Sequence, residues 1–365
     1  MAKEKMDEMH LLLAGLKKTF GDDSVCFLGE NEKLSQVETR SSGSLALDIA
    51  LGGGWGKGRV ASLSGIERSG KTSLLCLTIA EAQVKEPDKL CAVIDLENTF
   101  NPEWASTLGV QLDRLVFSQP DKPAEEVYDM IENMVKTNKF SVIGLDSLAG
   151  LVPKEEFENE DWDKESRVGG ASKINSRAVR KLVNTGLLTK SGTSLILINQ
   201  LRDLIGGFSR YGTPTTTTGG RSLKHCYTHH VEVSIGEFFS EGTGNNKVFI
   251  GQQIVAKVAK NKIGPPLRKA VLNLYYKEGL DHVAELVAVA KMTDVLHGAG
   301  AWLTAMDPRT GELLTYEGKE MKFNGREKAM AAINDDIVNN GGGMYTLLMD
   351  KVLEIIKAGG NVCTF

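Results

Sequence analysis

The segment from Gly65 to Thr72, Gly-Ile-Glu-Arg-Ser-Gly-Lys-Thr, constrains the fold of this chain more than any other. It matches the P-loop pattern, in which a glycine-rich turn joins a buried strand to a helix. Residues 59–64 read as that strand, and residues 73–84 have helical apolar spacing. Backbone N–H groups and the helix N-terminus then face an anion. The segment therefore predicts a nucleoside triphosphate site, with Lys71 on the β- and γ-phosphates and the Thr72 hydroxyl on Mg²⁺.

Apolar runs of strand length alternate with helical patterns through the middle of the chain. This alternation predicts an α/β fold with a doubly wound, mostly parallel twisted sheet, whose ligands lie at the carboxyl ends of the strands. The strand-like runs are residues 59–64, 90–95, 140–146 and 194–199. The helical patterns are residues 72–84, 124–137 and 171–188. Further strand-like runs, which predict an antiparallel extension of the sheet, are residues 231–237, 253–258 and 270–276.

The two ends of the chain read as separate units. Apolar residues recur at three- and four-residue steps between Met6 and Phe20, which predicts an amphipathic helix, and residues 25–28 read as a strand. This arm could pack on its own domain or dock on another protomer. From about Asp281 the pattern predicts a small α/β module. Its helices are expected near residues 282–292, 326–338 and 344–357.

Composition excludes several classes of protein. The net charge of −4 indicates no global affinity for nucleic acid, although it permits local basic strips. Five cysteines without a C-x-x-C pair argue against a disulfide framework, and no signal-peptide core or membrane-length apolar run is present, so a cytoplasmic protein without a membrane role is expected. A metal site formed by neighbouring imidazoles and a thiol is a weaker alternative to packing or polar contact. Its members are His225, Cys226, His229 and His230.

Polar residues at the ends of three strand-like runs supply the groups that phosphoryl transfer requires. Asp146 ends an apolar run in the Walker B pattern and is predicted to bind Mg²⁺. Glu97 lies just past another run, where it could act as general base on water; the alternative is a helix cap. Gln200 ends a third run, and its neutral amide could hydrogen-bond a γ-phosphate.

Residues 201–221 form a long segment rich in glycine and threonine, a type of loop that is usually functional or disordered. It combines guanidinium groups, which contact phosphates, with aromatic rings, which stack on bases. These are Arg202, Phe208, Arg210, Tyr211 and Arg221. Because it follows Gln200 directly, a γ-phosphate contact could order it. We therefore predict a loop that binds single-stranded nucleic acid.

Two further basic groups have both a structural and a functional interpretation. The helix expected at residues 171–188 carries a basic row that could be a solvated face or part of a nucleic-acid track. The row comprises Lys173, Arg177, Arg180 and Lys181. Lys257, Lys260 and Lys262 could be a surface charge cluster, or could reach a phosphate on a neighbouring protomer as an arginine finger does.

Taken together, these residues resemble the RecA family of homologous-recombination ATPases along nearly the whole chain. The resemblance rests on several stretches beyond the P-loop. They are Val37-Glu38-Thr39 to Gly52, which includes SSGSLALDIALG at residues 41–52, Asp95-Leu96-Glu97, Ser118-Gln119-Pro120-Asp121, Leu145-Asp146-Ser147, Ile198-Asn199-Gln200-Leu201-Arg202, Thr216-Thr217-Thr218-Gly219-Gly220, Lys260-Asn261-Lys262-Ile263, Glu285-Leu286-Val287 and Gly298-Ala299-Gly300-Ala301-Trp302.

The resemblance implies a helical filament of head-to-tail protomers on single-stranded DNA, with ATP and Mg²⁺ between neighbours, that performs homologous pairing and strand exchange with duplex DNA. It implies an oligomerisation arm at residues 1–35, an ATPase core at 36–280 and a small C-terminal domain at 281–365 that could contact duplex DNA. The DNA-binding loops would lie near residues 158–169 and 201–220. Single-strand-binding and loader proteins are implied partners.

The resemblance also assigns roles to individual residues. Glu97 is similar to the catalytic glutamate, Gln200 to the γ-phosphate sensor, and Lys260 and Lys262 to lysines that reach ATP across the interface. Asn101, Trp104 and Tyr276 are similar to adenine-side contacts. The phosphate-side contacts are Gly65, Glu67, Arg68, Ser69, Gly70, Lys71, Thr72, Ser73 and Asp146. The DNA backbone contacts are Ser176, Arg180, Gly219 and Gly220.

The chain departs from the family pattern at a few positions. Ile66 and Arg68 replace the usual Pro and Ser, Trp104 replaces a Tyr, and His225 stands where the family has an interface Phe. The last change bears on how ATP binding is coupled to DNA binding. The alternatives are a ring helicase or motor built on the same core, and an accessory paralogue without turnover.

Overall fold

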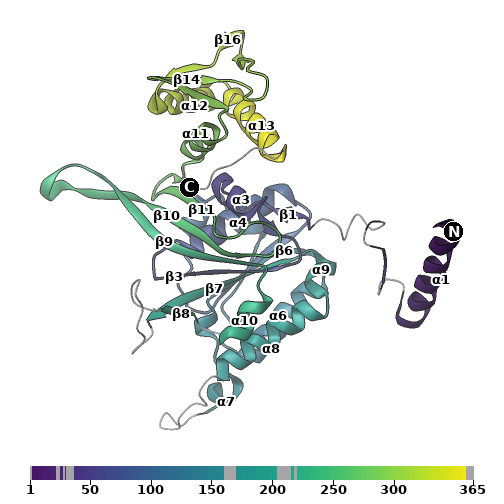
Figure 1. Ribbon diagram of the computed structural model, residues 1–365. Helices are drawn as coiled ribbons and strands as arrows, with labels where there is room; N and C mark the ends of the chain where they lie inside the picture. The colour runs from purple at the N-terminus through teal and green to yellow at the C-terminus, as the bar shows by residue number, and fades with distance from the viewer. Residues whose placement is uncertain are drawn as a thin grey trace. The chain divides into compact units, whose positions relative to one another are not determined.

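The computed structural model describes residues 2–21, 25–27, 29, 37–159, 170–203, 215–217 and 220–358 (Figure 1). The chain divides into two compact units, Met1–Glu38 and Thr39–Phe365. The first contains α1 (Ala2–Phe20), whose large apolar side chains such as Met9, Leu12 and Phe20 are exposed. We expected a strand at residues 25–28, but residues 25–27 do not form one, so this prediction is wrong there. A strand forms only where a neighbouring strand completes its backbone hydrogen bonds.

A large mixed sheet forms the centre of the second unit. Its parallel part has the order β9-β3-β7-β6-β4-β5, and antiparallel strands continue it beyond β9 as β10-β11-β12. The predicted α/β class, with a mostly parallel sheet and an antiparallel extension, is confirmed. The parallel strands are β3 (Val60–Gly65), β4 (Leu90–Asp95), β5 (Leu115–Ser118), β6 (Phe140–Asp146), β7 (Ser194–Asp203) and β9 (His229–Glu241). The others are β8 (Thr215–Thr217), which pairs with β7, β10 (Val248–Asn261), β11 (Lys269–Tyr275) and β12 (Gly279–Leu280).

Helices cover both faces of the sheet because successive residues of each buried strand point to opposite sides. In β4, Val93 belongs to the core under the first group of helices, and Ile94 to the core under the second. The first group comprises α3 (Leu45–Leu51), α4 (Lys71–Lys85) and α5 (Pro102–Thr107). The second comprises α6 (Ala124–Lys136), α8 (Gly170–Asn184), α9 (Leu187–Ser191) and α10 (Gly220–Cys226). The continuous helix expected over residues 171–188 is wrong, since the left-handed Gly186 (φ 70°) separates α8 from α9.

The C-terminal residues form a module with a hydrophobic core of its own. Three helices pack with a small antiparallel sheet of the order β13-β14-β17 (Figure 1). The elements are α11 (His282–Met292), β13 (Leu296–Ala299), β14 (Trp302–Ala305), β15 (Thr315–Tyr316), β16 (Lys319–Glu320), β17 (Lys322–Asn324), α12 (Arg326–Asn339) and α13 (Gly343–Lys357). The short elements β1 (Thr39–Arg40), β2 (Trp55–Gly56) and α7 (Lys154–Phe157) complete the second unit.

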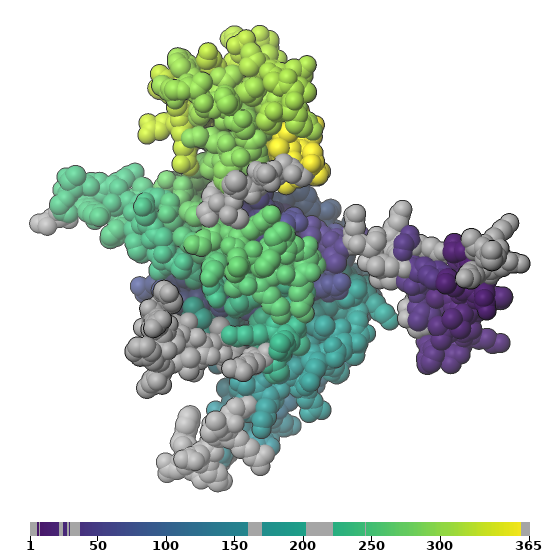
Figure 2. All heavy atoms as spheres, in the orientation of Figure 1, coloured from purple at the N-terminus to yellow at the C-terminus, as the bar shows by residue number. Residues whose placement is uncertain are grey.

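The hairpin β9–β10 extends past the rest of the sheet. Only the first residues of β9 pair with β3, and its outer part pairs with β10 alone, so the hairpin projects from the body (Figure 2). Among the described helices, none combines the length and apolar character needed to cross a membrane.

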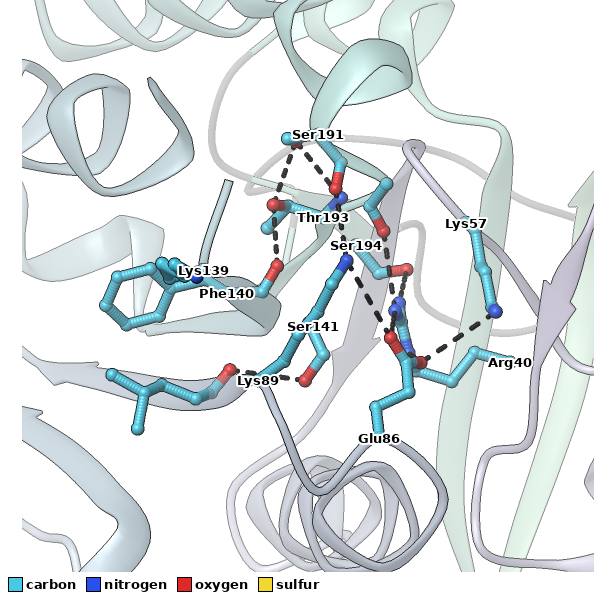
Figure 3. A network of polar contacts seen from close by, with 12 residues as sticks. Arg40, Lys57, Glu86, Lys89, Lys139, Phe140, Ser141, Ser191, Thr193 and Ser194 are labelled. Atoms are coloured by element: carbon cyan, nitrogen blue, oxygen red, sulfur yellow. Dashed lines mark hydrogen bonds and ion pairs between the residues drawn. The ribbon is translucent and has the colours of Figure 1, made fainter. Parts of the chain in front are cut away.

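Charged and polar side chains form a network at the amino ends of the central strands (Figure 3). The buried Arg40 guanidinium donates to both carboxylate oxygens of Glu86 (2.8 and 3.1 Å) and to the Ser194 hydroxyl (2.5 Å). Lys57 and Lys89 lie 4.0 and 3.9 Å from the Glu86 carboxylate. Each buried charge at this edge is therefore matched by an opposite charge or a hydrogen-bond partner, as burial in a low dielectric requires.

Candidate functional site

The P-loop turn between β3 and α4 can form only with glycine at two positions. Gly70 has a φ of 96°, in the left-handed region, and a Cβ there would collide with the Ile254 side chain on β10. A Cβ at Gly65 would collide with the carbonyl oxygen of Val233 on β9. Strands β9 and β10 thus pack so closely against the backbone of the turn that a side chain has no room at these two positions. Helix α4 starts directly after the turn.

Lys71 and Thr72 are the first two residues of α4, and the Lys71 side chain folds back onto the turn. The Lys71 amine donates to the carbonyl oxygens of Gly65 (3.1 Å) and Ile66 (2.6 Å). Burial lowers the pKa of Lys71, although the carboxylates of Asp146, Glu97 and Glu67 oppose this. An ammonium with little solvent around it and a helix N-terminus beside it form a strong anion site.

Carboxylates from two adjacent strands meet at this edge. The parallel register pairs Asp95 of β4 with Asp146 of β6, and the Thr72 hydroxyl donates to Asp146 Oδ2 (2.6 Å). Burial raises the pKa of Asp146 to about 6; the Thr72 hydrogen bond opposes this, whereas the nearby acids Glu97 and Asp95 add to it. Hydroxyl and carboxylate oxygens are the ligands Mg²⁺ prefers, and a divalent cation would relieve this crowding of negative charge. The residues therefore fit a Mg²⁺ site.

Glu97 lies at the centre of a hydrogen-bonded group. Gln200 Nε2 on β7 donates to Glu97 Oε1 (2.7 Å), and the Ser147 hydroxyl donates to the same oxygen. The Glu97 backbone N–H in turn donates to Asp95 (3.1 Å), which also accepts from Gln119 (3.1 Å). The helix-cap alternative for Glu97 is wrong, because α5 is capped by Asn101. Sequence reasoning missed Ser147 and Gln119 as supporting residues, although both lie in stretches that carried the family resemblance.

A cavity of about 340 Å³ adjoins the P-loop. Trp104 and Tyr276 both line it, and Trp104 Nε1 donates to the Ser73 hydroxyl (3.0 Å), so the structure brings these three predicted residues together. Asn101 is not among the lining residues: its side chain accepts from the Trp104 backbone N–H (3.1 Å) and caps α5. The full lining is Arg68, Gly70, Lys71, Thr72, Ser73, Trp104, Gln252, Leu274 and Tyr276.

The structure adds Gln252 of β10 to this cavity. Its Nε2 donates to the carbonyl oxygen of Arg68 (3.1 Å), a non-glycine residue held at a left-handed φ of 59°. Glu67 is exposed, whereas the Ser69 hydroxyl is buried without a hydrogen-bond partner among the described residues. No sequence signal indicated Gln252, because its role comes from the packing of β10 against the P-loop.

Lys260 and Lys262 lie away from the P-loop of their own chain. Lys260 pairs in register with His230, at the start of β9, whereas the P-loop follows the far end of β3. Their amines donate to backbone carbonyls in the last turn of α10: Lys260 to Lys224 (2.5 Å) and Lys262 to His225 (2.8 Å). Burial and the neighbouring Lys262 lower the pKa of Lys260. Lys257 is instead 3.5 Å from Glu232, which fits the surface-cluster interpretation.

The predicted DNA-binding residues divide between described and undescribed parts of the chain. Strand β7 runs on to Asp203 and pairs with β8, so the base of the 201–220 segment is a two-stranded ribbon. Helix α10 begins at Gly220. Residues 160–169 of the first loop, and Phe208, Arg210, Tyr211 and Gly219 of the second, lie outside the described residues, as do the side chains of Arg202 and Arg221.

A basic cavity of about 390 Å³ lies between α8 and α10. Ser176 and Arg180 line it with His225 and Lys262, and the Ser222 hydroxyl bonds that of Ser176 (2.8 Å). Lys173, Arg177 and Arg180 are exposed on α8, but Lys181 bonds Glu132 of α6 (2.5 Å) and so serves helix packing.

The histidine cluster is divided between a helix and a strand and does not form a metal site on one helical face. Helix α10 ends at Cys226, and His229 and His230 begin β9, so His225 and His229 do not share a helical face. The buried His229 ring packs edge-on against Trp55, and His230 stacks on Tyr227. Within the described residues, no group of three potential His, Cys, Asp or Glu ligands is close enough to hold a metal ion.

A P-loop after β3, acids at the ends of β4 and β6, and an amide on β7 opposite the last residue of β3 define a P-loop ATPase with a RecA-type sheet. A family model described as the RecA N-terminal domain matches residues 7–281. The chain is 36% identical to protein RecA of Methylobacterium radiotolerans over 353 residues, 96% of this chain and 92% of that protein. It is 37% identical over 333 residues to protein RecA of Chlorobium limicola, covering 91% and 88%, and 40% identical over 303 residues to that of Lactococcus lactis subsp. cremoris, covering 82% and 75%.

The chain belongs to the RecA family, which confirms the resemblance. It is therefore a DNA-dependent ATPase of homologous recombination and DNA repair, which binds ATP and DNA and self-associates into filaments that exchange strands. The residue roles set out above stay predictions.

Proposed function

We propose that each protomer of this filament hydrolyses ATP at the P-loop edge, with Glu97 as general base and Gln200 as the link to DNA. The observation that carries this proposal is the hydrogen bond from Gln200 to Glu97. Gln200 lies on β7, which continues through Asp203 into the proposed DNA loop. A γ-phosphate that attracts the Gln200 amide would free Glu97 to accept a proton from water and would shift the start of the loop.

The remaining P-loop residues bind and orient ATP. The Lys71 ammonium would contact the β- and γ-phosphates, and Trp104 and Tyr276 would hold the base in the adjoining cavity. Thr72 and Asp146 would hold Mg²⁺, which when bound neutralises negative charge on the phosphate oxygens. Asn101 would act indirectly, because it caps the helix that carries Trp104.

The interface between protomers would complete the site. Lys260 and Lys262 would exchange their carbonyl partners on α10 for the γ-phosphate of a neighbour's ATP, as cationic fingers do. A head-to-tail contact of this kind does not close on itself, so it generates a helical filament. Helix α1 would dock its exposed apolar side chains on the adjacent protomer. The C-terminal module would contact duplex DNA, and single-strand-binding and loader proteins would act with the filament in the cytoplasm.

The first test is ATP hydrolysis with and without single-stranded DNA at a fixed salt concentration. Strong stimulation is expected, because DNA bound at the proposed loop would act on Gln200 through strand β7, which leads into that loop. Absence of stimulation with ATP still bound would favour an accessory paralogue. Electron microscopy then separates the expected helical filaments from the rings of a helicase.

The DNA loops can be tested through the salt dependence of binding. Replacing Arg202 and Arg221 with Ala removes two proposed phosphate contacts, so the slope of log affinity against log salt should fall by about 1–2. Lys85→Ala with Lys122→Ala, which removes two exposed charges of the core outside the proposed ATP and DNA sites, is the matched control. An unchanged slope in the arginine variant would remove these residues from the DNA site.

A further inference from the structure

Helix α3 belongs to two hydrophobic cores at once. Ala46, Leu47, Ala50 and Leu51 are buried in the core on one face of the central sheet, whereas Ile49 is buried in the core of the C-terminal module. The helix packs against β10 and β11 on one side and α11 on the other. Buried cores are close-packed and transmit strain, so a shift of the C-terminal module must displace or strain α3.

The first turn of α3 is held by the C-terminal module. The Glu285 carboxylate of α11 accepts from the backbone N–H groups of Leu45 (2.9 Å) and Ala46 (3.1 Å) and from the Ser44 hydroxyl (2.5 Å). Burial raises the pKa of Glu285 to about 7; these donors oppose the shift, and the neighbouring Asp48 adds to it. Three donors on one buried carboxylate make this a rigid joint.

The other end of α3 is held by Asn261. Its side-chain Nδ2 donates to the carbonyl oxygen of Leu51 (2.8 Å), and its Oδ1 accepts from the backbone N–H groups of Ile263 and Gly264 (both 3.0 Å). Asn261 stands between Lys260 and Lys262 at the end of β10. It therefore sets both the path of the backbone that carries the two lysines and the distance of that backbone from α3.

We propose that Asn261 is a positioning residue for Lys260 and Lys262, and that α3 transmits to it the position of the C-terminal module through Glu285. The inference rests on the proposed function, in which these two lysines act on the ATP of a neighbouring protomer. The position of an ammonium against a reacting phosphate must hold to a fraction of an ångström, since an error of about 1 Å can cost about 10²-fold in rate. A flexible lysine on an unanchored strand end does not meet that requirement.

Two substitutions at Asn261 separate its two contacts. Asn261→Asp keeps the acceptor for Ile263 and Gly264 but loses the donor to Leu51, and Asn261→Ala loses both. With saturating single-stranded DNA, both should lower kcat by about 10- to 100-fold. KM for ATP should change little, because the P-loop of the same chain is intact. Asn339→Ala, which removes an exposed amide that donates to Asp335 on the same helix, α12, is the matched control.

A mixing experiment distinguishes positioning across the interface from damage within the chain. In filaments made from equal amounts of Asn261→Asp and Glu97→Gln protomers, some intact P-loops face intact lysines. Turnover should recover to about a quarter of the wild-type rate if protomers mix at random. A mixture no faster than the average of its two components would overturn the positioning role, as would a wild-type kcat for Asn261→Asp alone.

The relay through α3 is tested by a double-mutant cycle. Glu285→Gln keeps one acceptor oxygen but sets an amide against the Leu45 N–H, and it should lower kcat by about 3- to 10-fold. The pair Glu285→Gln and Asn261→Asp should be no slower than Asn261→Asp alone, since the joint they share is already broken. If the two substitutions lower kcat independently, so that their fold-losses multiply in the double variant, the relay is contradicted. Ser44→Ala removes one of the three hydrogen bonds to Glu285. It replaces Glu285→Gln in the cycle if that variant does not fold.

Lys262→Ala separates failure of this inference from failure of the proposed function. If Lys262→Ala hydrolyses ATP at the wild-type rate, the lysines do not act on ATP and both proposals fail. If Lys262→Ala is inactive while Asn261→Asp is fully active, only the positioning inference fails. Affinity for a fluorescent ATP analogue and the melting temperature of each variant show that its own P-loop and fold are intact.

Discussion

The two edges of the central sheet both bury charged side chains, yet they do so in opposite ways. At the amino ends of the strands, the Arg40 guanidinium meets Glu86 through two hydrogen bonds, with Lys57 and Lys89 nearby. At the carboxyl ends, acids on adjacent strands gather around the ammonium of Lys71. One edge matches charges, and the other crowds like charges together.

The pKa shifts express the same contrast. Burial would raise the pKa of Glu86, but Arg40 and the two lysines reverse the effect and lower it. Burial raises the pKa of Asp146 to about 6, and its acidic neighbours add to the shift. A protein retains an unfavourable arrangement of charge where a ligand is to relieve it. The comparison therefore teaches that one edge serves stability and the other serves binding, and four predictions test it.

The largest effect is expected from Glu97→Gln at the carboxyl edge. The amide cannot accept a proton from water, so turnover should fall by about 10²- to 10⁴-fold. ATP and DNA should still bind, because the new side-chain oxygen can accept from Gln200. Single-turnover hydrolysis and DNA-binding assays check this, with the exposed Glu126→Gln as control. Wild-type turnover would exclude Glu97 as the base.

Arg40→Met probes the amino edge. It leaves the half-buried Glu86 without its bidentate partner and removes a buried guanidinium that bonds the Ser194 hydroxyl, so the free energy of unfolding should fall by about 2–3 kcal/mol. Turnover per folded molecule should be unchanged, since Arg40 bonds Glu86, Gly192 and Ser194 at the edge of the sheet opposite the proposed ATP site. Urea unfolding and ATP hydrolysis on the same samples check both halves. If the variant lost turnover while keeping wild-type stability, the assignment of stability to the amino edge and binding to the carboxyl edge would be contradicted.

Asp146→Asn, at the carboxyl edge, should raise the free energy of unfolding, whereas Arg40→Met lowers it. A carboxyl whose pKa is raised in the folded state contributes stability at low pH that is lost as pH rises through about 6. At pH 8, without nucleotide or Mg²⁺, the asparagine variant should therefore be more stable than wild type by about 1–2 kcal/mol, although inactive. Urea unfolding measures the difference. A destabilised variant would show that Asp146 serves the fold.

The smallest effect concerns the acid side of the stability profile. The pKa of Glu86 is lowered in the folded state, so its contribution is present above its unfolded pKa and is lost as pH falls below that value. The stability difference between wild type and Arg40→Met should narrow below about pH 4, by up to about 1 kcal/mol, because Glu86 is partly solvated. Unfolding curves from pH 3 to 7 test this. A constant difference would mean that Arg40 acts through packing alone.

The parts of the fold that follow from local pattern could be predicted from the sequence. The parallel strands and the helices between them came from apolar periodicity, which reports which face of an element is buried. The break at Gly186 was missed, because a single left-handed glycine does not disturb the apolar spacing on either side. The strand expected at residues 25–28 was wrong over residues 25–27, because strand formation depends on a partner that periodicity does not reveal.

The site divides in the same way. The P-loop, Asp146, Glu97 and Gln200 were predicted because each lies at or just past the end of an apolar run, and the carboxyl ends of parallel strands meet at one edge. The structure brings Thr72 to Asp146 and Gln200 to Glu97, and the roles of these residues stay predictions. Gln252 and Ser147 were missed as contributors, since their roles depend on which strands become neighbours. The use of Lys181 to bond Glu132 was missed for the same reason.

The sequence by itself therefore determined the class of fold, the phosphate-binding turn and the acids at the strand ends, because short-range periodicity and glycine chemistry specify them. Only the tertiary structure decided that Gln200 bonds Glu97, that Lys260 and Lys262 turn toward α10, and that α3 joins Asn261 to Glu285. Asn261 and Glu285 each bond a helix more than 200 residues away in the chain. Such contacts follow from strand order and packing, and no local pattern encodes them.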